Sequence, residues 1–278
     1  MLPLYCSVQT GYPAGGRLRL FRAHGLGNDY LVLEDSQGLS PDLVRAICDR
    51  HRGVGGDGIL EPKPAKDGAY GVCIWNPDGS IAEKSGNGLR IFAWWLVNRR
   101  GAPAEFDVWT GHDTVQCEVS GQDISVAMGR AVVEMPRRLD GLDREFRQVD
   151  LGNPHAVVFV EDDLDALPWR QWGEWLEQHP HFQNRTNVQI ARVVDISTVE
   201  IRIWERGAGE TLASGSSSCA VASAGVASGR LRPGPITVRM PGGILHVNVD
   251  AAMSVLLRGP VEPIGVCEVW PSWLSARG

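Results

Sequence analysis

The feature that most constrains the fold of this chain is an internal repeat with a spacing of 129 residues. The stretch "WNPDGSIAEKSGNG" begins at Trp75 and "WERGAGETLASGSS" begins at Trp204, and in both a Ser-Gly pair follows ten positions later. The same shift lays "DGIL" (57–60) on "TNVQ" (186–189), and "HGLGND" (24–29) has a looser echo in "LGNPH" (151–155). We therefore expect two similar halves, which a chain of 278 residues is long enough to fold as separate domains.

Most of the remaining pattern predicts strands. Alternating or short apolar segments occur at 17–23, 30–34, 71–75 and 114–119 in the first half, and at 156–160, 198–204, 236–240 and 254–259 in the second. Alternation is typical of sheets that bury one face. The segments after Ser85 and Ser214 are instead apolar all round, which predicts one buried helix in each half. Shorter helices are expected after Ser40-Pro41 and after Pro168.

Composition excludes several classes of function. The net charge is −6, without the basic stripe that nucleic-acid binding needs, so we expect no nucleic-acid partner. Apolar runs such as "IFAWWLV" (91–97) are too short to cross a bilayer, so we expect no membrane partner. The six cysteines show no C-x-x-C spacing, which indicates neither a zinc site nor a disulfide framework and fits a reducing cytoplasm. Residues 1–16 lack the features of a secretory signal and are interpreted as a tail.

Each Ser-Gly pair marks a candidate anion site at the start of a helix. The residues are Ser85 with Gly86 and Asn87, and Ser214 with Gly215 and Ser216. A helix N-terminus presents N–H groups without helical acceptors and a partial positive charge, and small residues let a ligand approach closely. For a single such site, ordinary N-capping by serine is the commoner explanation. Two copies in repeated frames favour the binding of an anionic group such as a carboxylate.

Asn-rich turns and one charged strand end are further candidates for binding a small polar ligand. The asparagines are Asn28, Asn76, Asn153 and Asn187. Asparagine is common in turns for local reasons, but amides also donate and accept around an amino or carboxylate group. Arg206 is suited to clamp a carboxylate and Glu205 to receive an ammonium, with a surface salt bridge as the alternative. His155 is either a structural hydrogen-bond donor or a base that tunes a neighbour.

Six blocks of the sequence together point to a known family. They are "FRAHGLGNDYLVLE", "RHRGVGGDGIL", "NPDGSIAEKSGNGLRIFA", "LGNPHAVVF", "NRTNV" and "WERGAGETLASGSSSCA", and they run in order from Leu20 to about Gly259. In these blocks the chain resembles the diaminopimelate epimerases, which are cofactor-independent amino-acid epimerases. The resemblance implies an α/β (α+β) fold of two pseudo-twofold-related domains, each an antiparallel barrel-like sheet around a central helix, with substrate between them. The domains would be 17–131, completed by 262–278, and 132–261.

The resemblance also implies roles for individual residues. In the family two cysteines work from opposite faces of the substrate, without pyridoxal phosphate or metal, and Ser85 and Ser214 stand at their positions. The substrate would be held by Asn28, Asn76, Asn153, Asn187, Glu205 and Arg206, with backbone amides from Gly86, Asn87, Gly215 and Ser216. His155 and Glu205 would modulate the second acid/base. A homodimer that acts on diaminopimelate or a related amino acid, in lysine and cell-wall amino-acid metabolism, is implied as well.

The chain departs from the family where the chemistry takes place. Serines replace both catalytic cysteines, and Gly58 replaces a family glutamine. If a serine hydroxyl is about five pKa units less acidic than a thiol, forming its alkoxide costs about 7 kcal/mol more, roughly a 10⁵-fold loss of rate. Cys219 lies five residues into the second helix and is expected to face away from the N-terminus of that helix.

Three hypotheses remain open at this point. The first is an isomerase that uses its serines with an adjacent base. Ser214 has candidate bases in His155 and Glu205, whereas the sequence reveals no such neighbour for Ser85. The second is a protein that binds an amino acid but has lost the chemistry. The third is a double cysteine-to-serine variant of an ordinary epimerase.

Overall fold

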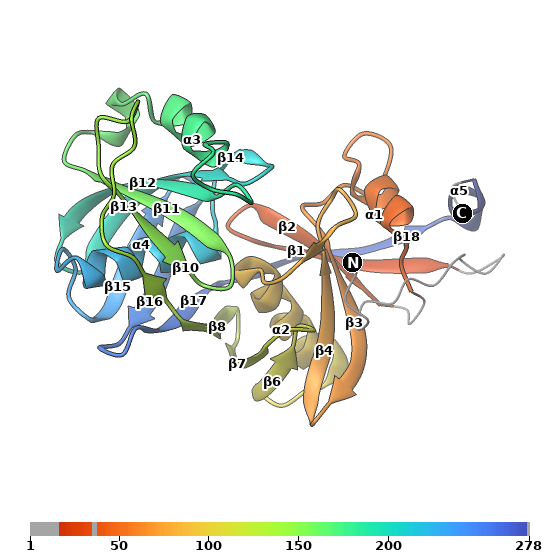
Figure 1. The fold of residues 1–278 in the computed structure, drawn as a ribbon. Helices are drawn as coiled ribbons and strands as arrows, with labels where there is room; N and C mark the ends of the chain where they lie inside the picture. Colours follow the sequence, from red (N-terminus) through yellow and green to blue (C-terminus); the bar gives the residue numbers. More distant parts are fainter. Residues whose placement is uncertain (1–16, 35–37, 277–278) are drawn as a thin grey trace. The chain divides into compact units, whose positions relative to one another are not determined.

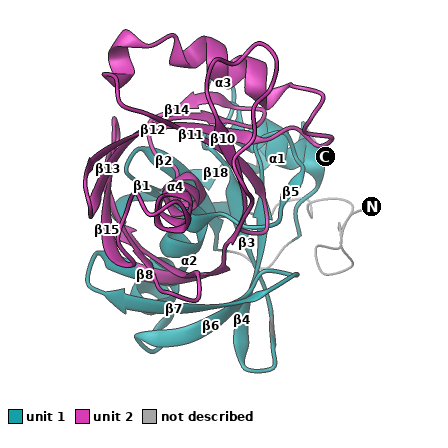
Figure 2. Ribbon diagram, turned by 60° about the vertical axis from the view of Figure 1, so that its left-hand side comes forward, with its two compact units in different colours: residues 1–124, 260–278 teal, residues 125–259 magenta. Residues whose placement is uncertain are grey.

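A computed structural model describes residues 17–34 and 38–276 of the chain (Figure 1). The predicted tail, residues 1–16, lies outside the described residues. The chain divides into two compact units, residues 1–124 with 260–278 (unit 1) and residues 125–259 (unit 2), coloured separately in Figure 2. Each unit is built mostly of strands.

The strands of unit 1 form one sheet of mixed direction. They are β1 (Leu18–Gly25), β2 (Asn28–Leu33), β3 (Ile59–Lys66), β4 (Ala69–Trp75), β5 (Ile81–Ala82), β6 (Glu105–Trp109), β7 (Thr114–Ser120) and β18 (Glu262–Val269). They pair in the order β18–β1–β2–β3–β4–β6–β7, and β5 also pairs with β4. The pairs β2–β3 and β4–β6 are parallel and the others are antiparallel.

The strands of unit 2 repeat this arrangement. They are β8 (Asp123–Arg130, which begins at the unit boundary), β9 (Val132–Val133), β10 (Phe146–Asp150), β11 (Pro154–Val160), β12 (Asn187–Asp195), β13 (Thr198–Glu205), β14 (Gly209–Thr211), β15 (Gly234–Met240), β16 (Gly243–Val249) and β17 (Ser254–Pro260). They pair in the order β9–β10–β11–β12–β13–β15–β16–β17, and β14 also pairs with β13. Here β11–β12 and β13–β15 are the parallel pairs.

Helices in the connections explain the parallel pairs, because parallel neighbours need a long crossover that usually contains a helix. The crossovers carry α1 (Pro41–Cys48), α2 (Gly86–Arg100), α3 (Trp169–Glu177, after the short 3₁₀ helix Leu164–Ala166) and α4 (Gly215–Ala227). A further helix, α5 (Pro271–Ser275), follows β18. No helix among residues 17–34 and 38–276 is both long and apolar enough to span a bilayer.

The helices α2 and α4 occupy the centre of their units. Their first residues, Gly86 and Gly215, are 129 positions apart, as the repeat predicts. Figure 2 shows α4 nearly end on, with strands of its own unit around it, and it contacts β9 to β13, β15 and β16. Its small residues let these strands approach from all sides, and nearly the whole helix is buried. The predicted fold of two repeated domains, each with a sheet around a central helix, is therefore confirmed.

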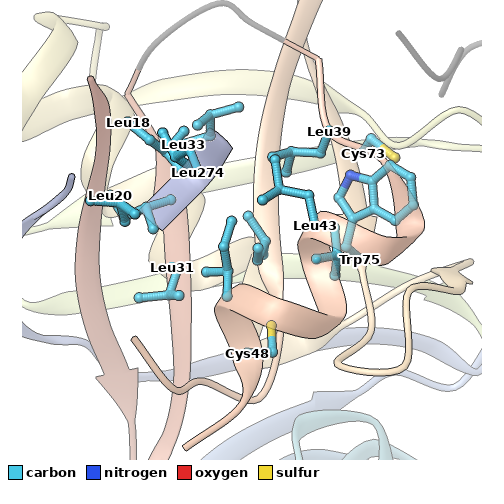
Figure 3. Packing of buried hydrophobic residues seen from close by; sticks show 14 residues of the cluster. Leu18, Leu20, Leu31, Leu33, Leu39, Leu43, Cys48, Cys73, Trp75 and Leu274 are labelled. Atoms are coloured by element: carbon cyan, nitrogen blue, oxygen red, sulfur yellow. The ribbon is translucent and has the colours of Figure 1, made fainter. Parts of the chain in front are cut away.

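The outer face of the unit 1 sheet has its own apolar core. Leu43 of α1 packs in one cluster with Leu39 and Trp75, and Leu274 of α5 joins the same cluster beside Leu33 (Figure 3). Ser40 caps α1 by accepting from Leu43 N, as predicted. The segment that follows residue 260 thus contributes both a strand and core side chains to unit 1.

Candidate functional site

In unit 1 the candidate site centres on Ser85, which caps α2. Its backbone is extended (φ −139°, ψ 115°), and its Oγ accepts from Gly88 N at 3.0 Å. Helix geometry leaves the N–H groups of Gly86 and Asn87 without acceptors inside the helix. Ser85 is half-buried, so its hydroxyl lies at the border between core and surface. The geometry confirms the N-cap, and the anion site stays a prediction.

Ser85 has a neighbour that the sequence did not reveal. The phenolic oxygen of Tyr30 lies 3.1 Å from Ser85 Oγ, and Tyr30 is only 7% exposed. Tyr30 belongs to β2, 55 residues earlier in the chain. Tyr30 itself could be read from the sequence, directly after "GND". Its contact with Ser85 becomes evident only from the fold, in which β2 pairs with β3.

The amides of Asn28 and Asn87 are brought together. Asn87 Nδ2 donates to Asn28 Oδ1 at 2.9 Å, and Asn28 Nδ2 donates to Asp57 Oδ2 at 2.8 Å. The fully buried Arg90 donates from Nη2 to Asn87 Oδ1 at 2.8 Å. These contacts orient two predicted substrate-binding side chains and use one of the two N–H groups on each amide.

A charged cluster supports this side of the site. Arg50 Nη2 lies 2.6 Å from both Asp29 Oδ1 and Asp57 Oδ1, and Arg22 Nε donates to Asp29 Oδ2 at 2.9 Å. Burial acts to raise the pKa of Asp29, but the hydrogen bonds and charges of Arg50 and Arg22 outweigh it and hold that pKa below its usual value. Asp29 is therefore ionised, and it fixes the start of β2.

Asn76, also predicted to bind substrate, lies in the turn after β4. Its side-chain Nδ2 donates to Ser80 Oγ at 2.9 Å, and its backbone N–H donates to Ser80 O at 2.8 Å. The residue is half-buried. Its observed hydrogen bonds are local to the turn and differ from the network of Asn28 and Asn87.

In unit 2 Ser214 caps α4 in the same way, and it is more deeply buried. Its backbone is extended (φ −147°, ψ 126°), and its Oγ accepts from Ser217 N at 3.4 Å. It is 3% exposed, and its carbonyl accepts from Ser218 Oγ at 2.8 Å. Gly215 is buried and Ser216 is half-buried in the first turn of the helix. Cys219 is fully buried further along α4.

A buried polar chain connects this helix start to His155. Gln189 Nε2 lies 2.9 Å from Ser217 Oγ and 3.1 Å from His155 Nδ1, and His155 Nε2 lies 2.9 Å from Asn153 Oδ1. His155, Gln189 and Ser217 are fully buried. An imidazole that accepts at Nδ1 and donates at Nε2 is neutral. Gln189 and Ser217 were missed from the sequence, although a glutamine within an apolar strand was a signal.

Burial of His155 has a large electrostatic effect. Burial is the largest cause, and together with the positive charge of Arg206 it lowers the pKa of His155 to about 3. The imidazole is thus neutral at neutral pH. The hydrogen bonds described for it go to Asn153 and Gln189, while Ser214 Oγ accepts from the helix.

Asn187 positions the charged end of β13. Its Nδ2 donates to Pro154 O at 3.0 Å and its Oδ1 accepts from Arg206 N at 3.0 Å. Arg206 is exposed, whereas Glu205 before it is half-buried. The buried carboxylate of Glu177, on α3, accepts from Gly207 N at 3.0 Å and so fixes the same turn.

Among the residues that the structure describes, no group of three or more His, Cys, Asp or Glu side chains has a geometry that could hold a metal ion. In unit 1 the candidate site consists of a capped helix start with neighbouring hydroxyl and amide groups. In unit 2 it consists of a capped helix start with neighbouring amides, a buried imidazole and an exposed guanidinium.

Comparison with known proteins gives consistent matches. The family model described as "Diaminopimelate epimerase" matches residues 20–134 and 147–263. "Diaminopimelate epimerase 2" of Nostoc sp. is 39% identical over 274 residues, covering 91% of this chain and 95% of the relative. "Diaminopimelate epimerase" of Desulforudis audaxviator is 38% identical over 269 residues, covering 87% of this chain and 96% of the relative.

Solved structures of low sequence identity share the fold. A predicted epimerase from Pseudomonas aeruginosa superposes with a TM-score of 0.70 at 19% identity, covering 91% of this chain and 99% of that one. A hydroxyproline epimerase from Agrobacterium vitis, with bound trans-4-hydroxy-L-proline, has a TM-score of 0.73 at 15% identity, covering 91% of this chain and 92% of that one.

Proposed function

The chain belongs to the diaminopimelate epimerase family, and on that premise we propose that it is an isomerase that inverts the α-carbon of an amino acid without a cofactor. The proposed substrate is LL-diaminopimelate, converted to the meso form, or a closely related amino acid of lysine and cell-wall metabolism. The observation that carries the proposal is the pair of serine-capped helices, α2 and α4, at equivalent positions of the repeat.

The chemistry requires removal of the α-proton and return of a proton to the opposite side. We assign these two steps to Ser85 and Ser214, one in each direction of the reaction. The bonding electrons of the broken C–H bond remain on the α-carbon and are delocalised into the adjacent carboxylate. Backbone N–H groups at a helix N-terminus stabilise such negative charge.

The remaining predicted residues supply substrate binding in this proposal. They are Asn28, Asn76, Asn153, Asn187, Glu205 and Arg206, with the backbone amides of Gly86, Asn87, Gly215 and Ser216. The contact between Asn28 and Asn87 supports a preorganised amide surface in unit 1. In unit 2 the support comes from Asn187, which fixes the backbone of the exposed Arg206. The guanidinium of Arg206 can bind a carboxylate in bidentate fashion.

One observation favours a second candidate function, a protein that binds an amino acid without epimerising it. His155, proposed to assist Ser214, has a pKa of about 3 and hydrogen bonds to Asn153 and Gln189. A base so weak removes a proton from serine poorly at neutral pH. Under the main proposal His155 instead orients the buried chain that ends at Ser217, and we assign the role of base for Ser214 to the half-buried Glu205.

Exchange of the α-proton in deuterated water distinguishes the two functions. The protein is incubated with LL- and meso-diaminopimelate, and loss of the α-proton signal is followed by NMR. The isomerase proposal expects exchange that is lost in Ser85→Ala and in Ser214→Ala and retained in Ser120→Ala, an exposed serine of β7. Saturable binding of diaminopimelate without exchange would establish the binding function instead.

A cysteine variant tests whether the serines occupy the acid/base positions. Ser85→Cys combined with Ser214→Cys should raise the exchange rate by at least about tenfold, because a thiol titrates near 8.5. No gain in this variant, in a protein that still binds substrate, would contradict the assignment. We further propose a cytoplasmic homodimer, on the basis of the family resemblance, and sedimentation equilibrium tests its oligomeric state.

A further inference from the structure

We propose that Tyr30 is the positioning residue that activates Ser85, by holding the proton that Ser85 releases when it takes the α-proton of the substrate. The proposal rests on the function proposed above and names the base that the sequence failed to reveal for this serine. Its basis is the 3.1 Å contact between Tyr30 Oη and Ser85 Oγ.

The backbone holds this contact in place. Leu31 N donates to Gly58 O at 3.0 Å and Asp57 N donates to Asp29 O at 2.7 Å, on either side of Tyr30. The parallel register pairs Leu31 with Ile59. The backbone of Tyr30 is therefore anchored on β2, which pairs with β1 on one side and with β3 on the other.

Gly58 provides the space that the tyrosine ring occupies. A Cβ at this position would lie 2.5 Å from Cε1 of Tyr30 and 2.4 Å from the carbonyl oxygen of Trp75. Contacts this short are not tolerated, and the Trp75 carbonyl belongs to the sheet. The phenol of Tyr30 can therefore lie beside Ser85 because position 58 carries no side chain.

The orientation of Ser85 suits the transfer of a proton to Tyr30. Gly88 N–H donates to Ser85 Oγ at 3.0 Å, and the serine O–H can donate to Tyr30 Oη, which is a phenolate in the basic form of the pair that we propose. As Oγ accepts the α-proton, its own proton moves to Tyr30, which becomes a neutral phenol. In the reverse direction the phenol returns a proton to Ser85 as Oγ–H protonates the carbanion, so protons and charge balance.

The phenol of Tyr30 loses and regains a proton more easily than the aliphatic hydroxyl of Ser85. An unperturbed phenol titrates near 10, much closer to neutral pH than an aliphatic alcohol. General acid–base catalysis improves as the titration point of the base approaches the working pH. A Tyr–Ser pair thus recovers part of the rate that a serine without a base would lose.

Tyr30→Phe tests the inference because it keeps the ring that fills the space above Gly58 and removes only the hydroxyl. The rate of α-proton exchange on LL-diaminopimelate should fall about 10²-fold in kcat with KM nearly unchanged. The matched control is Tyr70→Phe, a half-buried tyrosine of the same unit whose ring packs edge-on against Phe106. It should retain full activity.

A pH profile separates proton transfer from a structural role. Replacement of Tyr30 by a fluorotyrosine makes the phenol more acidic and should move the acidic limb of the kcat profile to lower pH, whereas Ser85→Ala should abolish exchange in either background. Normal exchange by Tyr30→Phe, or a limb that fluorination leaves in place, overturns the inference alone. No exchange by the unmodified protein overturns the proposed function and the inference with it.

Discussion

Gln189 and Ser217 are joined by a buried hydrogen bond of 2.9 Å between Nε2 and Oγ. The bond links the central strand β12 to the first turn of α4, and the same nitrogen lies 3.1 Å from His155 Nδ1. Through this one amide the position of the helix start depends on the position of the imidazole. The Oε1 atom of Gln189 is buried with no hydrogen-bond partner, so the amide holds both contacts at some cost in desolvation.

Replacement of Gln189 by methionine keeps the volume and removes both donor contacts. We expect the free energy of unfolding to fall by about 1–3 kcal/mol, because Ser217 Oγ and His155 Nδ1 lose a buried partner. Urea unfolding measures the change. The control is Gln171→Met on the exposed side of α3, where a change within about 0.5 kcal/mol is expected. Equal stability of the two variants would contradict the role of the buried chain.

The stability of the protein should depend on pH through His155. Its pKa falls from an ordinary value of 6.5 to about 3, so the unfolded chain binds a proton between these values and the folded chain does not. The contribution of His155 to the free energy of unfolding is therefore fully present above pH 6.5. It decreases as the pH falls towards 3, by roughly 2 kcal/mol at pH 5. His155→Gln should flatten this dependence in urea titrations at pH 5 and 7, and His246→Gln, at an exposed site on β16, should not.

A side chain at position 58 should disrupt unit 1. Gly58→Ala places a Cβ against the Trp75 carbonyl and the Tyr30 ring, and overpacking of this kind costs about 1–3 kcal/mol. Displacement of Tyr30 should also reduce α-proton exchange. Gly265→Ala on β18 is the control, because a Cβ there has nothing within 4 Å. Thermal unfolding reports the first effect, and a Gly58→Ala protein as stable as Gly265→Ala would refute it.

The turn that carries Arg206 should loosen when Glu177 is removed. Glu177 is 1% exposed and accepts from Gly207 N at 3.0 Å and from Arg185 Nη2 at 2.6 Å. Glu177→Ala should weaken substrate binding about tenfold, equivalent to about 1.4 kcal/mol, with a smaller change in kcat. Glu174→Ala, exposed on the same helix, is the matched control for the effect on KM.

The elements that local chemistry determines were predictable from the sequence. The starts of α2 and α4 follow from Ser85 and Ser214, because an N-cap and the glycine after it act within one turn. The segment 254–259 corresponds to β17 (Ser254–Pro260), with the same first residue and a last residue that differs by one. The resemblance also implied an antiparallel sheet, and most strand pairs are antiparallel. Each unit in addition contains two parallel pairs, at the crossovers that carry helices.

The contacts of the candidate site were less accessible to sequence reasoning. Asn28 and Asn87 were each predicted, but their mutual hydrogen bond depends on how β2 lies against α2. Tyr30 becomes a neighbour of Ser85 only through the register of β2 with the strand that follows Gly58. The assigned roles of the site residues stay predictions that the exchange measurements test.

The pairing of β1 with β18 has a consequence for the order in which the protein forms during translation. Unit 2 is one continuous stretch, whereas unit 1 needs β18 and Leu274, which the ribosome makes only after all of unit 2. Synthesis usually lets the earlier domain fold first. Here unit 2 can fold while unit 1 still lacks its edge strand, β18. Limited proteolysis of nascent chains in which residue 259 is followed by a linker long enough to clear the ribosome should therefore find residues 125–259 protected and the first half still sensitive.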